Sequence, residues 1–239
     1  MLEQLLEVVV PNAADLAAHD KEAFTKIRKQ GLGASDSSVV LGVNQWKTVE
    51  ELIEEKKFDG ITEAEREVGE KENVRKGADL EPIILQKFIE WSGLEVAKPE
   101  PMFRLIEYPW LTINFDGLAE IPEGGLAPVE CKWISPFAKK YWNLDRAIEN
   151  WYDGKPYLYG SATSIADHVA KESELYGIPP YYYTQVQQQL LGTDENYAFL
   201  AALFDKGWDF KVFKIYQDPI LQEALVNKSK EVWDLIKGE

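Results

Sequence analysis

The sequence contains a single cysteine, Cys131, among its 239 residues. One thiol cannot form a disulfide within the chain, and it supplies too few ligands for a cysteine-based zinc site. No segment approaches the roughly 18 to 20 consecutive apolar residues that a membrane-spanning helix needs. The N-terminus is acidic where a signal peptide carries basic residues. We therefore expect a soluble, intracellular protein with no membrane partner.

Positive charge is also scarce. The chain has 26 lysines and arginines against 41 aspartates and glutamates, which gives a formal net charge of −15. A protein that coats nucleic acid through phosphate contacts has the opposite balance. Any nucleic-acid binding must therefore depend on local positive charge or on bound metal ions. Arg28, Lys29, Lys132, Lys139 and Lys140 are the residues that we expect to form such a local cluster.

The composition is that of a folded protein, with 45% hydrophobic and 28% charged residues. The length suits one large domain or two small ones. Because there is neither an internal repeat nor a low-complexity linker, we expect one mixed α/β domain over residues 1–239.

Helix signals occur in six places. Thr48 and Glu51 form a capping box, Gly93 is a stop signal, and apolar residues recur at helical spacing in the longer segments. Residues 60–76 are densely charged and predict either a mobile segment or an exposed helix. The expected helices cover residues 15–29, a short stretch after Ser35 and Asp36, residues 48–58, 80–91 and 180–191, and a last segment from Pro219.

Strand signals dominate the middle of the chain and return near its end. Residues 111–116 and 128–133 alternate apolar and polar side chains, and residues 197–216 predict a β-hairpin. The alternation places Asp116 on the polar face of the first strand. Glu130 and Lys132 share the polar face of the second. We expect the two strands to be neighbours.

Two carboxylates and a lysine on one face of paired strands suit a particular chemistry. Mg²⁺ is usually held by one or two carboxylates together with water and substrate phosphate. Lys132 could neutralise charge on a phosphate or position a water for attack. The spacing therefore fits metal-assisted hydrolysis of a phosphodiester. Taken alone, the same residues are equally ordinary on the open face of a sheet.

Three further features have a functional and a structural interpretation. Glu81 is placed early in a helix, where an acid either points at a metal ion or favours the helix dipole. Gln185 and Gln189 lie four residues apart on one helical face, which faces either a site or solvent. Arg28 and Ser35 form either an anion pocket near a helix N-terminus or an exposed arginine beside an N-cap.

The order of these motifs along the chain is more specific than any one of them. The motifs are Arg28 with Gly33-Ala34-Ser35-Asp36, Gly77 with Glu81-Pro82, Asp116-Gly117, Val129-Glu130-Cys131-Lys132, and Pro180-Tyr181-Tyr182-Tyr183-Thr184-Gln185. As a set, over about residues 24 to 215, they resemble the phage lambda exonuclease family. These are the YqaJ-type viral recombinase nucleases of the PD-(D/E)XK superfamily.

The resemblance implies an α/β (α+β) fold with a mixed central β-sheet flanked by helices, the restriction-endonuclease-like core. It implies an exonuclease that uses Mg²⁺, or Mn²⁺ in its place, to degrade one strand of linear double-stranded DNA from the 5′ end. The biological setting would be phage-type homologous recombination by single-strand annealing. The implied partners are DNA ends, two further copies in a ring-shaped homotrimer, and a single-strand annealing protein. The implied location is the cytoplasm of a bacterium or of a phage-infected host.

The resemblance also implies roles for individual residues. Asp116, Glu130 and the backbone carbonyl of Cys131 would ligate the metal ion, and Glu81 would support a second ion or its water. Lys132 would orient and activate the attacking water, with assistance from Gln185. The 5′-phosphate would be held by Arg28 and Ser35.

Residues 137–178 are rich in aromatics. By the resemblance, the stretch between Lys132 and Gln185 that contains them is longer than in lambda exonuclease. We interpret residues 137–178 as a family-variable insertion with a small core of its own. An aromatic wedge that splits the duplex is the alternative. Two other functions stay open: an endonuclease or nickase of the same superfamily, and a non-catalytic acidic binding module on a nuclease fold.

Overall fold

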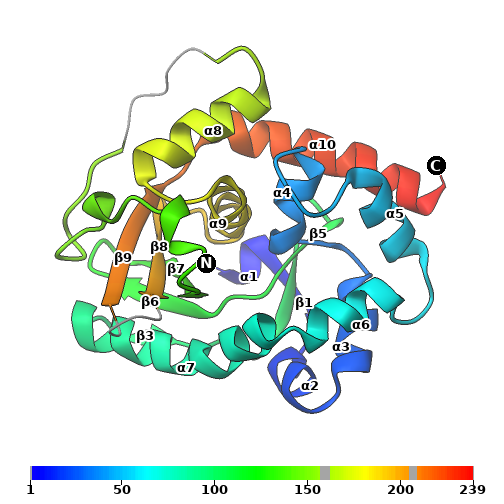
Figure 1. The fold of residues 1–239 in the computed structure, drawn as a ribbon, viewed down its shortest axis with the longest axis horizontal. Coiled ribbons are helices and arrows are strands. Elements are labelled where there is room, and N and C mark those ends of the chain that lie inside the picture. The colour runs from blue at the N-terminus through cyan, green and yellow to red at the C-terminus, as the bar shows by residue number, and fades with distance from the viewer. Residues whose placement is uncertain (1, 157–161, 205–208, 239) are drawn as a thin grey trace.

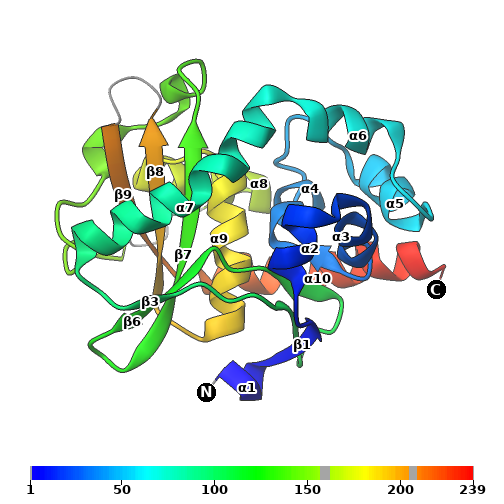
Figure 2. The same ribbon diagram turned by 90° about the horizontal axis from the view of Figure 1, so that it is seen from below.

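The computed structural model describes residues 2–156, 162–204 and 209–238. Two mixed β-sheets form the centre of the fold, and helices surround them (Figures 1 and 2). The larger sheet has the order β3-β6-β7-β8-β9, in which only β7 and β8 run parallel. Its strands are β3 (Val96–Ala97), β6 (Gly117–Ile121), β7 (Gly125–Ile134), β8 (Tyr197–Phe204) and β9 (Asp209–Tyr216). This arrangement confirms the predicted mixed α/β class.

The smaller sheet has the order β1-β4-β5-β2, and its last pair is parallel. Its strands are β1 (Leu6–Val10), β4 (Met102–Leu105), β5 (Leu111–Ile113) and β2 (Leu32–Gly33). The sequence did not predict this second sheet, because three of its strands, β4, β5 and β2, have only four, three and two residues. Strands that short carry almost no period-two signal.

The longer helices are α7 (Glu72–Ser92), α8 (Ile165–Tyr176), α9 (Pro180–Thr193) and α10 (Pro219–Lys237). Shorter helices lie nearer the N-terminus: α1 (Leu2–Leu5), α2 (Ala13–His19), α3 (Lys21–Arg28), α4 (Ser37–Val40), α5 (Val49–Lys57) and α6 (Glu63–Glu70). Helices α7, α8 and α9 contact the larger sheet, and α10 packs on α4, α5, α8 and α9. The part of the chain that the structure describes also has three 3-10 turns: η1 (Ala34–Asp36), η2 (Lys139–Tyr141) and η3 (Leu144–Arg146). In the described ranges, no helix has the length and apolar character that would let it cross a membrane.

The larger sheet separates two hydrophobic clusters. Helix α7 covers one face, where Ile84 and Phe88 pack with Val129 and Cys131. Helix α9 covers the other face, where the cluster continues toward α8, α10 and the smaller sheet. Side chains alternate along a strand, so Glu130 and Lys132 of β7 point toward α9. The predicted alternation of 128–133 is therefore confirmed, and it puts the acid and the lysine on the side of α9.

The predicted strand over 111–116 is wrong in extent. Only Leu111–Ile113 form a strand, and it belongs to the smaller sheet. The strand paired with β7 begins at Gly117, where an added Cβ would lie 2.7 Å from Leu85 Cδ1. The glycine thus lets the chain pass closely between α7 and β7, where a larger residue would require Leu85 to shift. Asp116 therefore lies where the chain crosses from one sheet to the other.

One helix prediction also needs correction, and the structure decides between the two interpretations of residues 60–76. The helix expected over 15–29 is broken at Asp20, whose side chain accepts a hydrogen bond from Ala23 N and caps α3. The charged segment 60–76 contains α6 and the start of α7, so its helical interpretation is the right one. Lys29 anchors α6 through a 2.9 Å ion pair with Glu65 that is largely buried. The helices predicted at 48–58, 180–191 and from Pro219 are confirmed.

The described part of residues 137–178 does not form a core of its own. Trp142 is buried against Tyr182, Phe204 and Phe213, and Val169 of α8 belongs to the cluster under α9. Trp151 and Tyr152 contact one another, but Trp151 packs against the cluster under α7, so these side chains join the two main clusters instead of forming a third. That the segment varies within the family stays a prediction.

Candidate active site

Glu130 is the most completely held acid at the centre of the larger sheet. It lies on β7 with 2% of its surface exposed. Gln185 Nε2 donates to its Oε1 and Gln189 Nε2 to its Oε2, each at 2.5 Å, and Lys132 Nζ forms an ion pair with Oε1. A buried carboxylate is stable only when its oxygens have such donors. Gln185 and Gln189 therefore both face Glu130 and not solvent.

Asp116 lies beside Glu130 at the start of β6. Its Oδ2 accepts a 2.8 Å hydrogen bond from the backbone N–H of Cys131. Burial raises the pKa of Asp116 well above its usual range, and repulsion from Glu130 and Glu81 raises it further. The acidic groups at this position therefore outweigh the donors that could neutralise them. Asp116, Glu130 and Lys132 are called the carboxylate centre below.

Lys132 is a permanent cation of this centre. Burial lowers the pKa of its ammonium, but the charges of Glu130 and Asp116 outweigh this effect and hold the pKa well above its usual range. Its Nζ also lies 5.4 Å from the centroid of the Tyr182 ring. Lys132 can thus donate hydrogen bonds and stabilise negative charge, whereas it cannot accept a proton in this state.

Glu81 lies at the edge of the centre and is held there by a lysine. It is the tenth residue of α7, which begins at Glu72 rather than near Leu80. The dipole of a helix acts mainly on its first turn, so the dipole interpretation of Glu81 is wrong. Its Oε1 forms a 2.9 Å ion pair with Lys98 Nζ. Nothing in the local sequence pattern pointed to Lys98, which follows a two-residue strand.

The donor set of the centre suits a hard divalent cation. Its ligands are carboxylate oxygens, and the raised pKa of Asp116 reports negative charge that a cation would relieve. The Cys131 thiol is on the other face, buried in the cluster under α7 with a raised pKa, and is no ligand. Across residues 2–156, 162–204 and 209–238, no three acidic, histidine or cysteine side chains already converge as a metal cluster. Asp116 and Glu130 are the neighbouring acids of this centre that could hold an ion, with Glu81 nearby.

Arg28 and Ser35 lie together on the surface, as the sequence predicted. Arg28 Nη2 donates to Ser35 Oγ at 2.8 Å, and both residues are exposed. Asp36, next to Ser35, is buried and forms a 2.7 Å ion pair with Lys56. Burial raises the pKa of Asp36, but Lys56 and Arg28 outweigh burial and lower it. A guanidinium and a hydroxyl that already share a hydrogen bond are suitable donors for a phosphate.

Helix α9 connects this surface pair to the carboxylate centre. Gln188 Nε2 donates to the carbonyls of Leu32 at 2.9 Å and Thr112 at 3.1 Å, which tie down the two parallel strands that lead to Ser35 and Asp116. Gln189, the next residue, holds Glu130. Neighbouring glutamines of one helix thereby fix the positions of both parts of the site.

A row of aromatic rings leads from the centre to the surface. Tyr182, beside Lys132, is in edge contact with Tyr181 at 4.5 Å between centroids, and Tyr181 is in edge contact with Trp46 at 4.8 Å. Trp46 is 66% exposed. The aromatic surface near the site therefore includes α9 and the loop after α4, besides the 137–178 segment that the sequence suggested.

The expected cluster of positive charge is only partly present. Lys29 is occupied with Glu65 in anchoring α6, and Lys139 pairs with Asp209 at 3.3 Å. The charge of Lys132 is taken up by Glu130. Ion pairing explains the difference, because a chain with this excess of acids provides nearby partners for most lysines.

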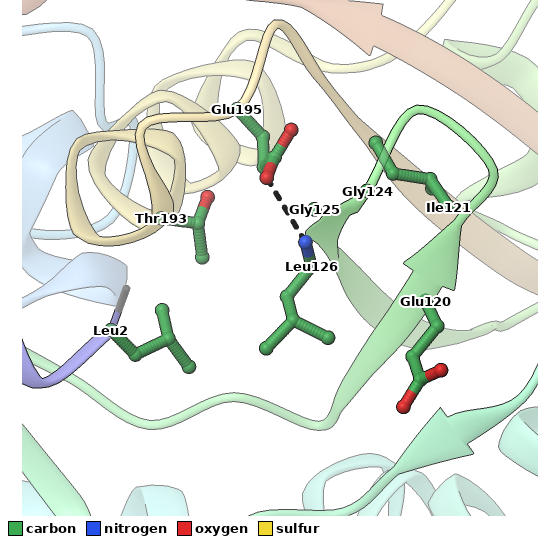
Figure 3. Close-up of a pocket in the computed structure, with 8 residues that line it drawn as sticks. All are labelled: Leu2, Glu120, Ile121, Gly124, Gly125, Leu126, Thr193 and Glu195. Carbon is green, nitrogen blue, oxygen red and sulfur yellow. Dashed lines mark hydrogen bonds between the residues drawn. The ribbon is translucent and has the colours of Figure 1, made fainter.

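A separate cavity of about 340 Å³ lies at the far end of the β6–β7 hairpin (Figure 3). Leu2, Ile121 and Leu126 give it an apolar wall, and the Glu195 carboxylate accepts the Leu126 N–H at 3.0 Å. None of the predicted site residues lines it. The cavity is therefore distinct from the carboxylate centre.

The larger sheet has helices on both faces and carries Glu130 and Lys132 on its central strand β7, with Asp116 immediately before β6. The chain belongs to the YqaJ-like viral recombinase domain family, which it matches over residues 23–196. The resemblance drawn from the sequence motifs is confirmed.

One individual relative with a similar sequence shares fewer than a third of its aligned residues with this chain. The uncharacterized protein YqaJ of Bacillus subtilis (strain 168) is 27% identical over 209 residues, which make up 87% of this chain and 53% of that protein. The chain thus spans about half the length of this curated relative.

Two solved structures share the fold. One is LHK-Exo in complex with dAMP, with a TM-score of 0.61, 13% identity, and coverage of 90% of this chain and 92% of that chain. The other is an alkaline exonuclease (LHK-Exo) from Laribacter hongkongensis, with a TM-score of 0.55, 15% identity, and coverage of 88% and 90%.

Proposed function

We propose that this protein is a Mg²⁺-dependent exonuclease that degrades one strand of linear double-stranded DNA from its 5′ end. The observation that carries the proposal is the carboxylate centre, where Glu130 and Lys132 of β7 meet Asp116 from the segment before β6. Membership of the viral recombinase family and the fold shared with an alkaline exonuclease support it.

The residues divide the work of phosphodiester hydrolysis. Asp116, Glu130 and the carbonyl of Cys131 would hold the ion, with Glu81 beside them. Mg²⁺ supplies Lewis acidity toward the scissile phosphate when bound, and Mn²⁺ supplies the same. Lys132 stays protonated, so it orients the attacking water and stabilises charge that develops on the phosphate. Gln185 and Gln189 keep Glu130 in one orientation.

Arg28 and Ser35 would hold the terminal 5′-phosphate. Their exposure and shared hydrogen bond support this role. The strong negative charge of the chain would keep general DNA affinity weak, so that an end with its phosphate is preferred over internal duplex. We also propose a homotrimer and a single-strand annealing partner, on the strength of family membership alone. Light scattering of the purified chain measures the oligomer directly.

Digestion of three labelled substrates tests the function. They are linear duplex with a 5′-phosphate, linear duplex with a 5′-hydroxyl, and closed circular duplex, each incubated with Mg²⁺ or with EDTA. We expect Mg²⁺-dependent loss of the 5′-phosphorylated strand and an intact circle. Cutting of the circle would point to an endonuclease instead. If no substrate is cut with Mg²⁺ or Mn²⁺, the chain is a binding module.

A further inference from the structure

Lys98 is a basic residue at the carboxylate centre to which the proposed reaction gives no part. It follows β3 and reaches across to α7, where its Nζ lies 2.9 Å from Glu81 Oε1. The side chains of Lys98 and Glu81 are 43% and 31% exposed. The ion pair is therefore open to solvent and ions, in contrast to the enclosed contacts of Glu130.

Lys98 also lies within the electrostatic field of the other acids. Burial lowers the pKa of Lys98, but the hydrogen bond and charge of Glu81 outweigh it, and the charge of Asp116 adds to them. The net result is a raised pKa. Asp116 and Glu81 in turn repel one another enough to raise the pKa of Asp116. Lys98 therefore interacts electrostatically with Asp116 as well as with its direct partner Glu81.

The charges around the centre alternate. Lys132 pairs with Glu130 and Lys98 pairs with Glu81. Asp116 has a backbone N–H as its donor and, within the described ranges, no ion pair of its own. Two lysines therefore balance two of three acids. A divalent cation that uses Asp116 and Glu81 together must take over a carboxylate that Lys98 now neutralises.

We propose that Lys98 is a positioning residue that competes with a divalent cation for Glu81. Lys98 holds the Glu81 carboxylate at the edge of the centre, and it must release that carboxylate before Glu81 can ligate an ion beside Asp116. The inference rests on the proposed function in one respect, namely that the centre takes a divalent cation.

Competition follows from charge and geometry. An ammonium and a divalent cation on the same carboxylate oxygen repel each other, so one replaces the other. An ion pair with this exposure is weak, which makes the exchange readily reversible. Lys98 therefore lowers cation affinity on the side of Glu81. Lys98 does not change the cation affinity at Glu130, because the contacts of that carboxylate are with Lys132 and the two glutamines.

Mn²⁺ binding to the whole chain without DNA tests the competition. Free Mn²⁺ is followed by electron paramagnetic resonance for the wild type, Lys98→Ala, Lys98→Arg, Glu81→Gln and the Glu81→Gln/Lys98→Ala double variant. We expect Lys98→Ala to bind Mn²⁺ roughly three- to tenfold more tightly, as suits the loss of one partly screened charge. Lys98→Arg keeps the charge and should match the wild type.

The double variant separates competition from a general effect of charge. Without Glu81 there is nothing to compete for, so the double variant should bind Mn²⁺ no more tightly than Glu81→Gln. Lys228→Ala is the matched control, because Lys228 also pairs with a carboxylate at 2.8 Å, on α10. It removes the same charge far along the chain from the centre and should leave Mn²⁺ affinity unchanged.

The opposing results are distinct. An affinity of Lys98→Ala that equals or falls below that of the wild type overturns the inference, as does a gain that persists in the Glu81→Gln background. Both results leave the proposed function standing. A wild type that binds no Mn²⁺, in the same way as Asp116→Asn, overturns the proposed function and the inference together.

Discussion

The carboxylate centre and the Arg28–Ser35 pair are built in opposite ways. Glu130 is 2% exposed and held mostly by neutral amides, whereas Arg28 and Ser35 are exposed and joined by one hydrogen bond. Buried charge needs fixed donors, and it interacts strongly because the local dielectric is low. Exposed charge interacts weakly but is available to a ligand. The first part therefore suits chemistry and the second suits recognition.

The largest expected effect follows from Asp116→Asn. Activity should fall roughly 10³-fold, because the several kcal/mol that an ion contributes to the transition state depend on this ligand. Turnover of 5′-phosphorylated duplex measures it. Retained Mg²⁺-dependent cleavage would show that the centre is assigned to the wrong residues.

The same variant tests the electrostatics of the metal-free protein. The pKa of Asp116 is higher in the folded state than its value of about 3.9 in the unfolded state. At a pH between these two pKa values, Asp116 is protonated in the folded protein and ionised in the unfolded one. The unfolding free energy should therefore fall as pH rises through this window. Asp116→Asn should remove that dependence and be more stable than the wild type at neutral pH. Urea unfolding in EDTA across the pH range measures both.

Lys132→Met should have the next largest effect. Activity should fall about 10²- to 10³-fold, because a fixed positive charge beside the phosphate is lost. DNA-end binding should change little, since Arg28 and Ser35 are untouched. Lys132→Arg is the control that keeps the charge. If binding is lost as severely as turnover, Lys132 acts mainly in binding DNA.

Gln189→Leu should have a moderate effect. It leaves Glu130 Oε2 without its amide donor, which should lower the unfolding free energy by about 1 to 3 kcal/mol. Activity should fall about tenfold or more, as is usual when a residue that orients a metal ligand is lost. Gln86→Leu is a matched control, because Gln86 bonds an acid on the exposed side of α7. If the two variants have equal effects, the buried contact of Gln189 contributes no more than the exposed contact of Gln86, which contradicts the prediction.

Arg28→Ala and Ser35→Ala should have the smallest effect. We expect about a tenfold loss of efficiency on 5′-phosphorylated ends, from one or two charge-assisted hydrogen bonds, and almost none on 5′-hydroxyl ends. Stability should not change, because both side chains are exposed. Added salt should weaken the wild type more than Arg28→Ala. A uniform loss on both kinds of end would remove the role in recognising the phosphate.

The core helices and strands could be predicted because their signals are local. The capping box at Thr48 and the alternation around Glu130 are each contained within a few residues, and the structure has both. The break at Asp20 and the end of β5 at Ile113 could not be found in this way. They depend on which distant segment each residue packs against.

The sequence by itself determined the family, the mixed α/β class and the list of candidate residues. The order of short motifs along the chain can be read without knowing which residues are in contact. Only the tertiary structure decided which of these residues meet. Gln189 holds Glu130 from 59 positions away, Lys98 holds Glu81 from 17, and Lys29 is withdrawn into an ion pair with Glu65 from 36. Partners of this kind are chosen by packing and by the need to satisfy buried charge, and neither leaves a periodic signal in the chain.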